Sequence, residues 1–119
     1  MATEHVVGTV SELPVGSKRI IKIGSLEIGV FNVNGTYYAL PNHCFHQGGP
    51  LCEGKTTGTV HVRAENDWKP EWVQEGEILV CPWHGLEFEI STGRCLARKR
   101  ARLRRYRVVV DGEEVKVVV

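Results

Sequence analysis

The sequence has no long apolar run, no recognisable export signal and almost no excess of charge. Its 119 residues carry 15 lysines and arginines against 14 acidic residues, a formal net charge of +1. No apolar segment approaches the roughly 20 residues that a membrane-spanning helix needs, and residues 1–5 lack the basic and apolar regions of a signal peptide. We therefore expect a cytoplasmic protein with no membrane segment, and the near-neutral charge argues against general nucleic-acid binding.

Cysteines are few, and nothing suggests that they form a disulfide framework. A chain without an export signal is expected in a reducing compartment, where its four cysteines stay free for metal binding or chemistry. Cys52 and Cys95 have no histidine at ligand spacing, and we expect both to be small buried apolar residues. The length is typical of one domain, and we treat residues 1–119 as a single unit.

The sequence also lacks a convincing amphipathic helix and instead shows short β-branched runs between turn signals. Asn34-Gly35 and Asp111-Gly112 are strong hairpin signals, each between two predicted strands. We expect an all-β fold in which the first third is a meander and the last strand offers an exposed edge, open to a neighbour or covered by the chain itself. The predicted strands are residues 5–10, 19–23, 26–32, 36–40, 59–63, 78–80, 86–90, 106–110 and 115–119.

Two short motifs dominate what remains. Residues 42–51 read Asn-His-Cys-Phe-His-Gln-Gly-Gly-Pro-Leu and residues 81–88 read Cys-Pro-Trp-His-Gly-Leu-Glu-Phe, and each contains one cysteine and one histidine. The spacing is C-x-H for Cys44 and His46 and C-x-x-H for Cys81 and His84. Two thiolates and two imidazoles form a metal site, and their residue types alone permit either a zinc ion or a two-iron cluster.

In these two motifs the sequence resembles the Rieske iron-sulfur family, whose boxes are C-x-H-x-G-x-P-L and C-P-x-H-G-x-x-F. The resemblance implies a [2Fe-2S] cluster with Cys44 and Cys81 on one iron and His46 and His84 on the other. It also implies an antiparallel β-sandwich base with a small cluster-binding lobe, formed by loops at about 41–55 and 80–95. Five further residues are expected to shape and surround the cluster: Gly48, Pro50, Pro82, Trp83 and Gly85.

Departures from the family pattern carry their own expectations. Thirty-four residues separate His46 from Cys81, more than in small Rieske ferredoxins, so we expect residues 56–76 to form an added hairpin or flap. Trp68 and Trp72 in this polar segment suggest a packed excursion. Phe45 replaces the small residue or proline often found between the first cysteine and histidine, and either shielding of the cluster or inward packing would explain it.

Four positions bear on the redox potential. Where respiratory Rieske proteins have two disulfide-forming cysteines and two hydroxyl donors, this sequence has Gly49, Trp83, Leu86 and Phe88. Donors to sulfur stabilise the more negative reduced state, so their absence lowers the potential toward the bottom of the Rieske range of about −150 to +300 mV. The resemblance therefore points to a low-potential ferredoxin.

A Rieske cluster transfers one electron and has no substrate site of its own. Only His5, His43 and His61 remain for other sites, and we expect none of them to bind metal, so the sequence lacks the mononuclear iron site of a ring-hydroxylating oxygenase. The expected function is electron transfer from a reductase to an oxygenase or similar redox enzyme. The alternatives are an accessory subunit of a nitrite-reductase-like complex and a structural zinc module.

Eight basic residues crowd into positions 94–107. They can be a solvated strand face, or Arg98, Arg100 and Arg102 can form part of a docking patch for an acidic redox partner, and the sequence leaves both open. Charge of one sign near an electron-transfer site can raise encounter rates by roughly ten- to a thousandfold at low salt. Nucleic acid is a weaker alternative because Tyr106 is the only aromatic residue in the run.

Overall fold

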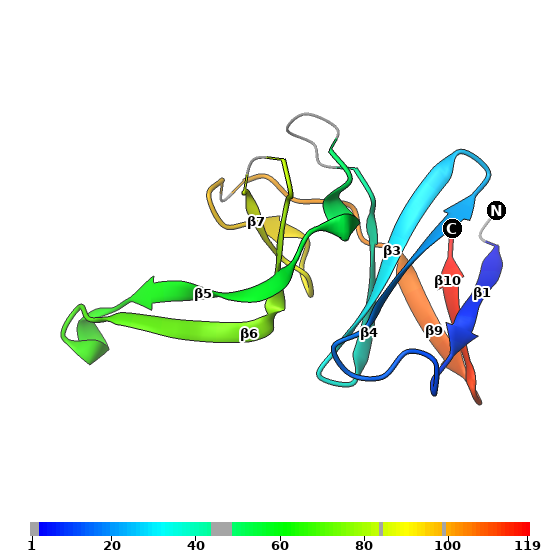
Figure 1. Ribbon diagram of the computed structural model, residues 1–119, viewed down its shortest axis with the longest axis horizontal. Helices are drawn as coiled ribbons and strands as arrows, with labels where there is room; N and C mark the ends of the chain where they lie inside the picture. Colours follow the sequence, from blue (N-terminus) through cyan, green and yellow to red (C-terminus); the bar gives the residue numbers. More distant parts are fainter. Residues whose placement is uncertain (1–2, 44–48, 84, 99) are drawn as a thin grey trace.

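The computed structural model describes residues 3–43, 49–83, 85–98 and 100–119, and it is built from antiparallel strands (Figure 1). Its described elements include two short 3-10 turns, η1 and η2, and no α-helix. The all-β prediction is confirmed. The first six elements are β1 (Glu4–Thr9), β2 (Lys18–Ile23), β3 (Leu26–Val33), β4 (Thr36–Pro41), η1 (Leu51–Glu53) and β5 (Thr56–Val62). The remaining six are η2 (Ala64–Asn66), β6 (Pro70–Val80), β7 (Glu87–Glu89), β8 (Arg94–Cys95), β9 (Arg107–Asp111) and β10 (Glu114–Val118).

Two three-stranded sheets form the base of the molecule. One has the order β2-β3-β4 and the other β1-β10-β9, and their facing side chains share one buried core. Ile28 and Val30 of β3 meet Val115 and Val117 of β10 in that core. β10 alternates buried and less buried residues, as a sheet packed on one face requires. β3 is buried without a break from Ile28 to Asn32, because Phe31 on its other face packs into a second core. The base is therefore the antiparallel sandwich expected from the sequence.

The position of the first strand differs from the sequence-based expectation. The meander is confirmed for β2, β3 and β4, but β1 pairs with β10 instead of β2. Of the two possibilities left open for residues 115–119, the structure shows cover by the chain itself, because β10 lies between β1 and β9. A run of valines with turn signals on one side fits an edge strand and a central strand equally well, so the pattern could not tell them apart.

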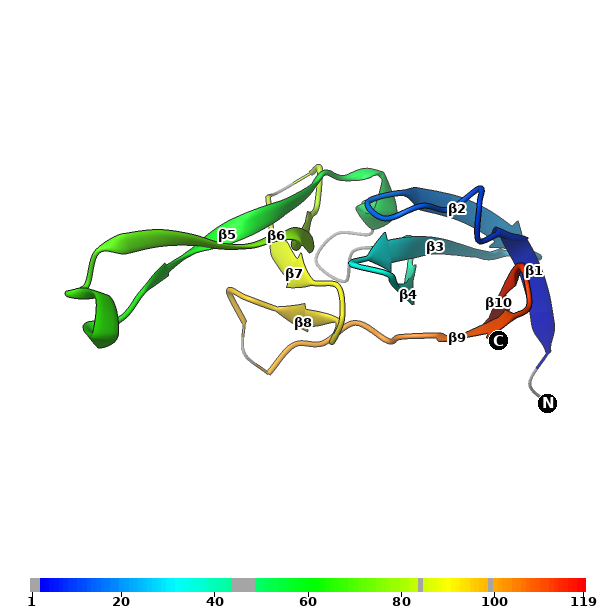
Figure 2. The ribbon, with the colours of Figure 1, turned by 90° about the horizontal axis from the view of Figure 1, so that it is seen from below.

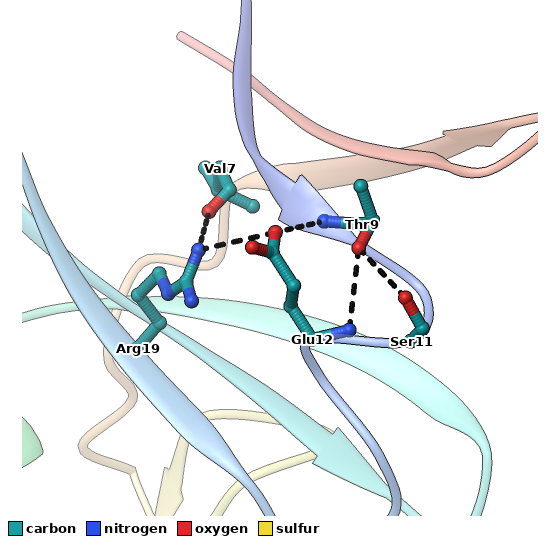
Figure 3. Close-up of polar contacts among 5 residues, drawn as sticks. All are labelled: Val7, Thr9, Ser11, Glu12 and Arg19. Atoms are coloured by element: carbon teal, nitrogen blue, oxygen red, sulfur yellow. Dashed lines mark hydrogen bonds and ion pairs between the residues drawn. The ribbon is translucent and has the colours of Figure 1, made fainter.

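A polar corner ties the two sheets of the base together (Figure 3). The Arg19 guanidinium on β2 donates to the carbonyl of Val7 on β1 at 2.8 Å and lies 3.7 Å from the Glu12 carboxylate. That carboxylate also accepts from the backbone N–H of Thr9, and these contacts lower the pKa of Glu12, the Thr9 hydrogen bond first. Gly8 sits at a bulge in β1, where a Cβ atom would stand 2.6 Å from the Arg19 guanidinium. Gly8 has φ +158°, a conformation that residues with a side chain rarely adopt, so the bulge favours a glycine.

A third sheet, β5-β6-β7-β8, lies beside the base and extends into a long hairpin. The outer part of β5 and β6 projects from the rest of the molecule in both ribbon views (Figures 1 and 2). We call this projection, residues 59–73, the arm. At residues 56–76, where we expected an added hairpin or flap, the chain forms the hairpin of β5 and β6. The expected packed excursion is wrong, because Trp68 and Trp72 are 66% and 57% exposed. Both indoles are more exposed than buried, and Trp72 keeps one hydrogen bond, donated by its indole N–H to the Glu75 carboxylate.

A second buried core lies where the third sheet meets the base. It contains Phe31 of β3, Leu79 of β6 and Phe88 of β7, together with Cys52 and Cys95. Both cysteines are fully buried and free, as expected. Burial raises the pKa of the Cys52 thiol to about 12, so the thiol stays protonated at neutral pH. This core sits under the loops that carry the two sequence motifs.

Candidate metal centre

The first motif follows β4 of the base and leads to η1, and the second motif lies between β6 and β7 of the third sheet. Of the four expected ligands, the structure describes Cys81, which is 1% exposed at the end of β6. Cys44, His46 and His84 lie outside the described residues, as do Phe45 and Gly48. The described residues contain no group of three or more histidine, cysteine or acidic side chains placed to hold a metal ion. The ligand set therefore remains a prediction from the sequence, and the scaffold around it can be tested for fit.

The second loop is a tight turn built around Cys81. The Cys81 backbone N–H donates to the carbonyl of Leu86 at 2.8 Å, and the Cys81 carbonyl accepts from the N–H of Gly85 at 2.9 Å. Gly85 has φ +70°, a left-handed conformation that a glycine adopts without strain. These bonds close the loop over four residues and hold the Cys81 thiol at the buried base of the turn.

The first loop is fastened at both of its ends. The Asn42 side-chain carbonyl accepts from the backbone N–H of Cys52 at 2.8 Å, which joins the residue before the motif to the residue after it. The Asn42 backbone N–H donates in turn to the carbonyl of Glu27 on β3 at 2.9 Å. Beneath this junction, the Cys52 sulfur lies against Gly29 of β3, with no room for a Cβ atom between them. The loop thus rises from a fixed base on the sandwich.

The two loops touch each other. A Cβ atom on Gly49 in the first loop would lie 2.8 Å from the indole of Trp83 in the second loop, so that contact needs a glycine. Below it, the N–H of Val80 donates to the carbonyl of Lys55 at 2.9 Å, and the Val80 carbonyl occupies the space that a Cβ on Gly54 would need. The scaffold brings the two cysteine-histidine motifs side by side, which fits a metal group held by ligands from both.

The expected surrounding residues take different positions. Pro50 is half-buried, whereas Pro82, Trp83 and Gly85 are exposed on the outer surface of the second loop. A hollow of about 600 Å³ opens beside them, between Lys55 and Thr57 at the start of β5 and the Cys81-Pro82 turn. The outer side of the second loop is thus open to a neighbouring molecule, while Cys81 is closed off from water.

The residues that replace hydroxyl donors are apolar and packed. Phe88 is fully buried in the same core as Cys81, and Leu86 packs against that core. Neither side chain can donate a hydrogen bond to sulfur. The surroundings described around Cys81 therefore carry no side-chain donor at the two positions where the resemblance locates hydroxyls in high-potential relatives.

Three polar residues support the site in ways that sequence reasoning did not predict. Glu87 and Glu89 link β7 to the hairpin of β5 and β6. Glu87 accepts from the Thr59 hydroxyl at 3.1 Å, and Glu89 accepts from the Gln74 side chain at 2.7 Å. Asn42 closes the first loop. Its place directly before the motif, after a proline that ends a strand, was the available signal, since asparagine often bonds to nearby backbone.

The basic run forms an exposed turn and strand next to the third sheet. Arg98, Arg100 and Arg102 are all exposed, and the turn is closed by a hydrogen bond from the Ala101 N–H to the Arg98 carbonyl at 2.9 Å. Leu103 is buried between exposed arginines, which is the alternation expected of a solvated face. No ion pair between described residues involves an arginine of positions 94–107, so the positive charge of the run stays uncompensated there.

The family comparison matches nearly the whole chain. A Rieske [2Fe-2S] domain model matches residues 3–107. The human apoptosis-inducing factor 3 is 31% identical over 90 residues, which are 76% of this chain but 12% of that protein. The ferredoxin component of a naphthalene 1,2-dioxygenase system from Pseudomonas aeruginosa is 25% identical over 107 residues, 89% of this chain and 86% of the relative. The chain thus spans a small part of the first relative and most of the second.

Solved structures show the same arrangement. The ferredoxin of carbazole 1,9a-dioxygenase from Nocardioides aromaticivorans IC177 superposes with a TM-score of 0.70 at 27% identity, covering 97% of this chain and 96% of the other. The small subunit of an NADH-dependent nitrite reductase from Mycobacterium tuberculosis has a TM-score of 0.72 at 15% identity, with 100% and 96% coverage, which shows a shared fold. Among the described residues no helix is long and apolar enough to cross a membrane.

Proposed function

Because the chain belongs to the Rieske [2Fe-2S] domain family, we propose that it is a ferredoxin that carries one electron from a reductase to a terminal oxygenase or similar redox enzyme. The observation that carries this proposal is the contact between the two motif loops at Gly49 and Trp83, over the buried Cys81. Ferredoxin components of dioxygenase systems are similar to nearly the whole chain, which supports a role as a carrier without its own substrate site.

The proposed ligands are Cys44 and Cys81 for one iron and His46 and His84 for the other. Bound there, the [2Fe-2S] cluster supplies one-electron redox chemistry. The chain contributes a scaffold: the Cys81 turn and the Asn42–Cys52 closure fix the two loops, and the apolar core below keeps water from the cysteine side. The whole chain acts as one domain, with cluster-binding loops at about 41–55 and 80–95.

We also propose a low potential and a cytoplasmic location. Leu86 and Phe88 offer no hydroxyl to sulfur, so the reduced state lacks a stabilisation that high-potential relatives have. A midpoint potential well above zero in protein-film voltammetry would contradict this part of the proposal. Free, buried Cys52 and Cys95 support the cytoplasmic location, since a reducing compartment keeps such thiols unpaired.

The direct test is the composition and colour of the purified protein. We expect a red-brown protein with two irons and two acid-labile sulfides per chain, and complete loss of the cluster in His46→Ala and His84→Ala. His43→Ala is the matched control, because His43 is an exposed histidine beside the first motif and should leave the cluster intact. A colourless protein with one zinc and no labile sulfide would establish the structural zinc alternative instead.

Arg98, Arg100 and Arg102 are proposed to steer an acidic redox partner toward the cluster. Their charge has no ion-pair partner among the described residues, and rim charges of this kind act mainly on association rates. The test measures reduction of the protein by a reduced flavodoxin, a small acidic redox protein. The rate should fall at least about tenfold in the triple Glu variant at low salt. Lys22→Glu with Lys69→Glu is the control, and equal losses in both variants would exclude a specific patch.

A second candidate is an accessory subunit of a nitrite-reductase-like complex, favoured by the shared fold with the M. tuberculosis small subunit. The two candidates differ in the lifetime of the complex. A ferredoxin leaves its partner after each electron, whereas a subunit stays bound. Stable co-purification with a flavin- or siroheme-containing protein from the native host would favour the subunit, and purification as a free cluster protein would favour the ferredoxin.

A further inference from the structure

The arm carries an uncovered apolar face. In the register of the hairpin, Val60 lies opposite Trp72 and Val62 lies opposite Pro70. Side chains of directly opposed residues project from the same face of a hairpin, so these four residues form one strip. The Trp72 indole lies over Gly58, where a Cβ atom would stand 2.9 Å from the ring. We call these residues, with Trp68 at the tip, the apolar strip.

The residues that the structure describes leave most of this strip uncovered. Val60 and Val62 are each 53% exposed, and the two tryptophans are exposed by more than half. With roughly 250 Å² for a fully exposed tryptophan and roughly 150 Å² for a valine, the exposed area of the strip is about 450 Å². Patches of this size on a soluble monomer commonly mark interaction sites. The exposed area therefore indicates that the strip is an interaction surface.

One ion pair of the arm lies away from the strip, and one carboxylate lies beside it, since Glu75 accepts a hydrogen bond from the Trp72 indole. Arg63 and Glu71 alternate with strip residues along their strands and so project from the opposite face, where they form an ion pair at 2.9 Å. The strip itself contains no charged side chain. Interfaces between identical subunits are the more apolar class and are rich in tryptophan, whereas short-lived redox complexes rely on charge.

The outer part of the arm has few stabilising contacts with the rest of the chain. Its root is tied to β7 by the hydrogen bonds from Thr59 to Glu87 and from Gln74 to Glu89, and beyond this point β5 and β6 pair with each other alone. A free two-stranded hairpin is marginally stable in water. Trp68 adds backbone strain, with φ +58°, while exposing its indole. A second copy of the chain carries the same strip, so it can cover the arm with a matching apolar surface.

We propose that two copies of this chain associate through their apolar strips, face to face about a two-fold axis. Each hairpin then supplies the second layer that the other lacks, as in any two-layer sheet packing. The contact goes beyond the proposed electron transfer and does not depend on it, since neither motif loop nor the basic run takes part. Two strips bury about 900 Å² in total, below the roughly 1,200 Å² of stable complexes, so the dimer depends on concentration.

The test is sedimentation velocity of the purified, cluster-loaded protein from 5 to 500 μM. We expect the mass to rise with concentration from 13.3 kDa toward twice that value. Val60→Lys should keep the protein monomeric across the range, because it places a lysine from each copy in an apolar contact. Val6→Lys is the matched control: Val6 is also a strand valine, 55% exposed, but on the base, and this variant should dimerise like the wild type. The visible spectrum and far-UV circular dichroism confirm that both variants are folded.

Four results would overturn the proposal. These are a wild-type protein that stays monomeric at 500 μM, a dimer that persists in Val60→Lys, equal loss of dimer in both variants, and a dimer that dissociates in 0.5 M salt. The last result would assign the contact to ion pairs instead of the strip. A monomeric wild type whose Val60→Lys variant exchanges electrons more slowly with its native redox partner would assign the strip to that partner.

Discussion

The contact between Gly29 and Cys52 offers a sharp test of how the first motif loop is anchored. Gly29 lies in the middle of β3 and is buried, and Cys52 lies in η1, directly after the loop. A Cβ atom on Gly29 would stand 2.5 Å from the Cys52 sulfur and 2.6 Å from its Cβ. Real Cβ contacts stay beyond 3.0 Å, so the Gly29→Ala variant must push η1 away from the sheet by at least 0.5 Å.

The expected cost is that of overpacking a closed core. Cys52 is fully buried and its Cβ cannot rotate away, and Phe31 blocks a third direction at 3.1 Å. We therefore place Gly29→Ala at the upper end of the range for overpacked cores, about 3 kcal/mol. A domain of this size loses roughly 3 to 5 °C in Tm per kcal/mol, so the thermal midpoint should fall by about 10 °C. The same displacement strains the Asn42–Cys52 closure and should speed cluster loss.

A double-mutant cycle separates this clash from a general effect of alanine. Cys52→Gly removes both clashing atoms and should cost about 1 to 2 kcal/mol alone, through lost burial and added chain freedom. The double variant should be no less stable than Cys52→Gly, because the added methyl group then fills the vacated space. Melting is followed by circular dichroism and by bleaching of the visible absorbance. A Gly29→Ala protein that melts within about 2 °C of the wild type, or additive losses in the cycle, would refute the anchor.

Three further outcomes test the site and its surroundings. Asn42→Ala removes the acceptor for the Cys52 N–H and should cost about 1 to 2 kcal/mol, with faster release of iron to a chelator than in Asn42→Asp, which keeps an acceptor. Phe88→Tyr should raise the midpoint potential by about 40 mV if the new hydroxyl donates to sulfur, since a net 1 kcal/mol hydrogen bond to the reduced state corresponds to that shift. An unchanged or lower midpoint potential would count against the missing hydroxyl donor as the cause of a low potential. The Cys52 pKa rises from 9.0 in the unfolded chain to about 12 in the fold, so the folded state binds more protons between these values, and the free energy of unfolding should fall by roughly 1.4 kcal/mol per pH unit above pH 9. Cys52→Ala should flatten that dependence in alkaline urea titrations.

The sequence predicted the local hairpins better than it predicted the connections between distant strands, and its ligand set stays a prediction. Cysteine and histidine at fixed spacing, followed by glycine and proline, are local features, and the hairpins at Asn34-Gly35 and Asp111-Gly112 are local as well. Pairing of β1 with β10 joins residues more than a hundred positions apart, and no local pattern encodes it. The exposure of Trp68 and Trp72 failed to follow from residue type for a related reason. Tryptophan is buried on average. These two side chains are exposed because no other layer of the described fold packs over the hairpin, and that depends on the whole fold.

The hydrogen bonds that Glu87 and Glu89 accept near the site were not predicted from the sequence either. Glu87 and Glu89 show the alternation of a half-exposed strand, and that pattern is correct. It gave no reason to expect that both carboxylates would accept hydrogen bonds from the root of the arm. Such bonds depend on which strand lies next to β7, and that neighbour is set by the length and path of the inserted hairpin.

The pairing of β1 with β10 has a consequence for how the protein is made. Thr3 and Val119 exchange backbone hydrogen bonds at 2.8 and 3.0 Å, so the two ends of the described chain meet in one sheet. During synthesis the first strand has no partner until the last one leaves the ribosome, and the core around Val115 and Val117 stays open until then. The β2-β3-β4 meander and the third sheet can form earlier, because their contacts are shorter in sequence. Closure of the sandwich is therefore expected to be the final step of folding, after the loops that hold the two motifs already have their local turns.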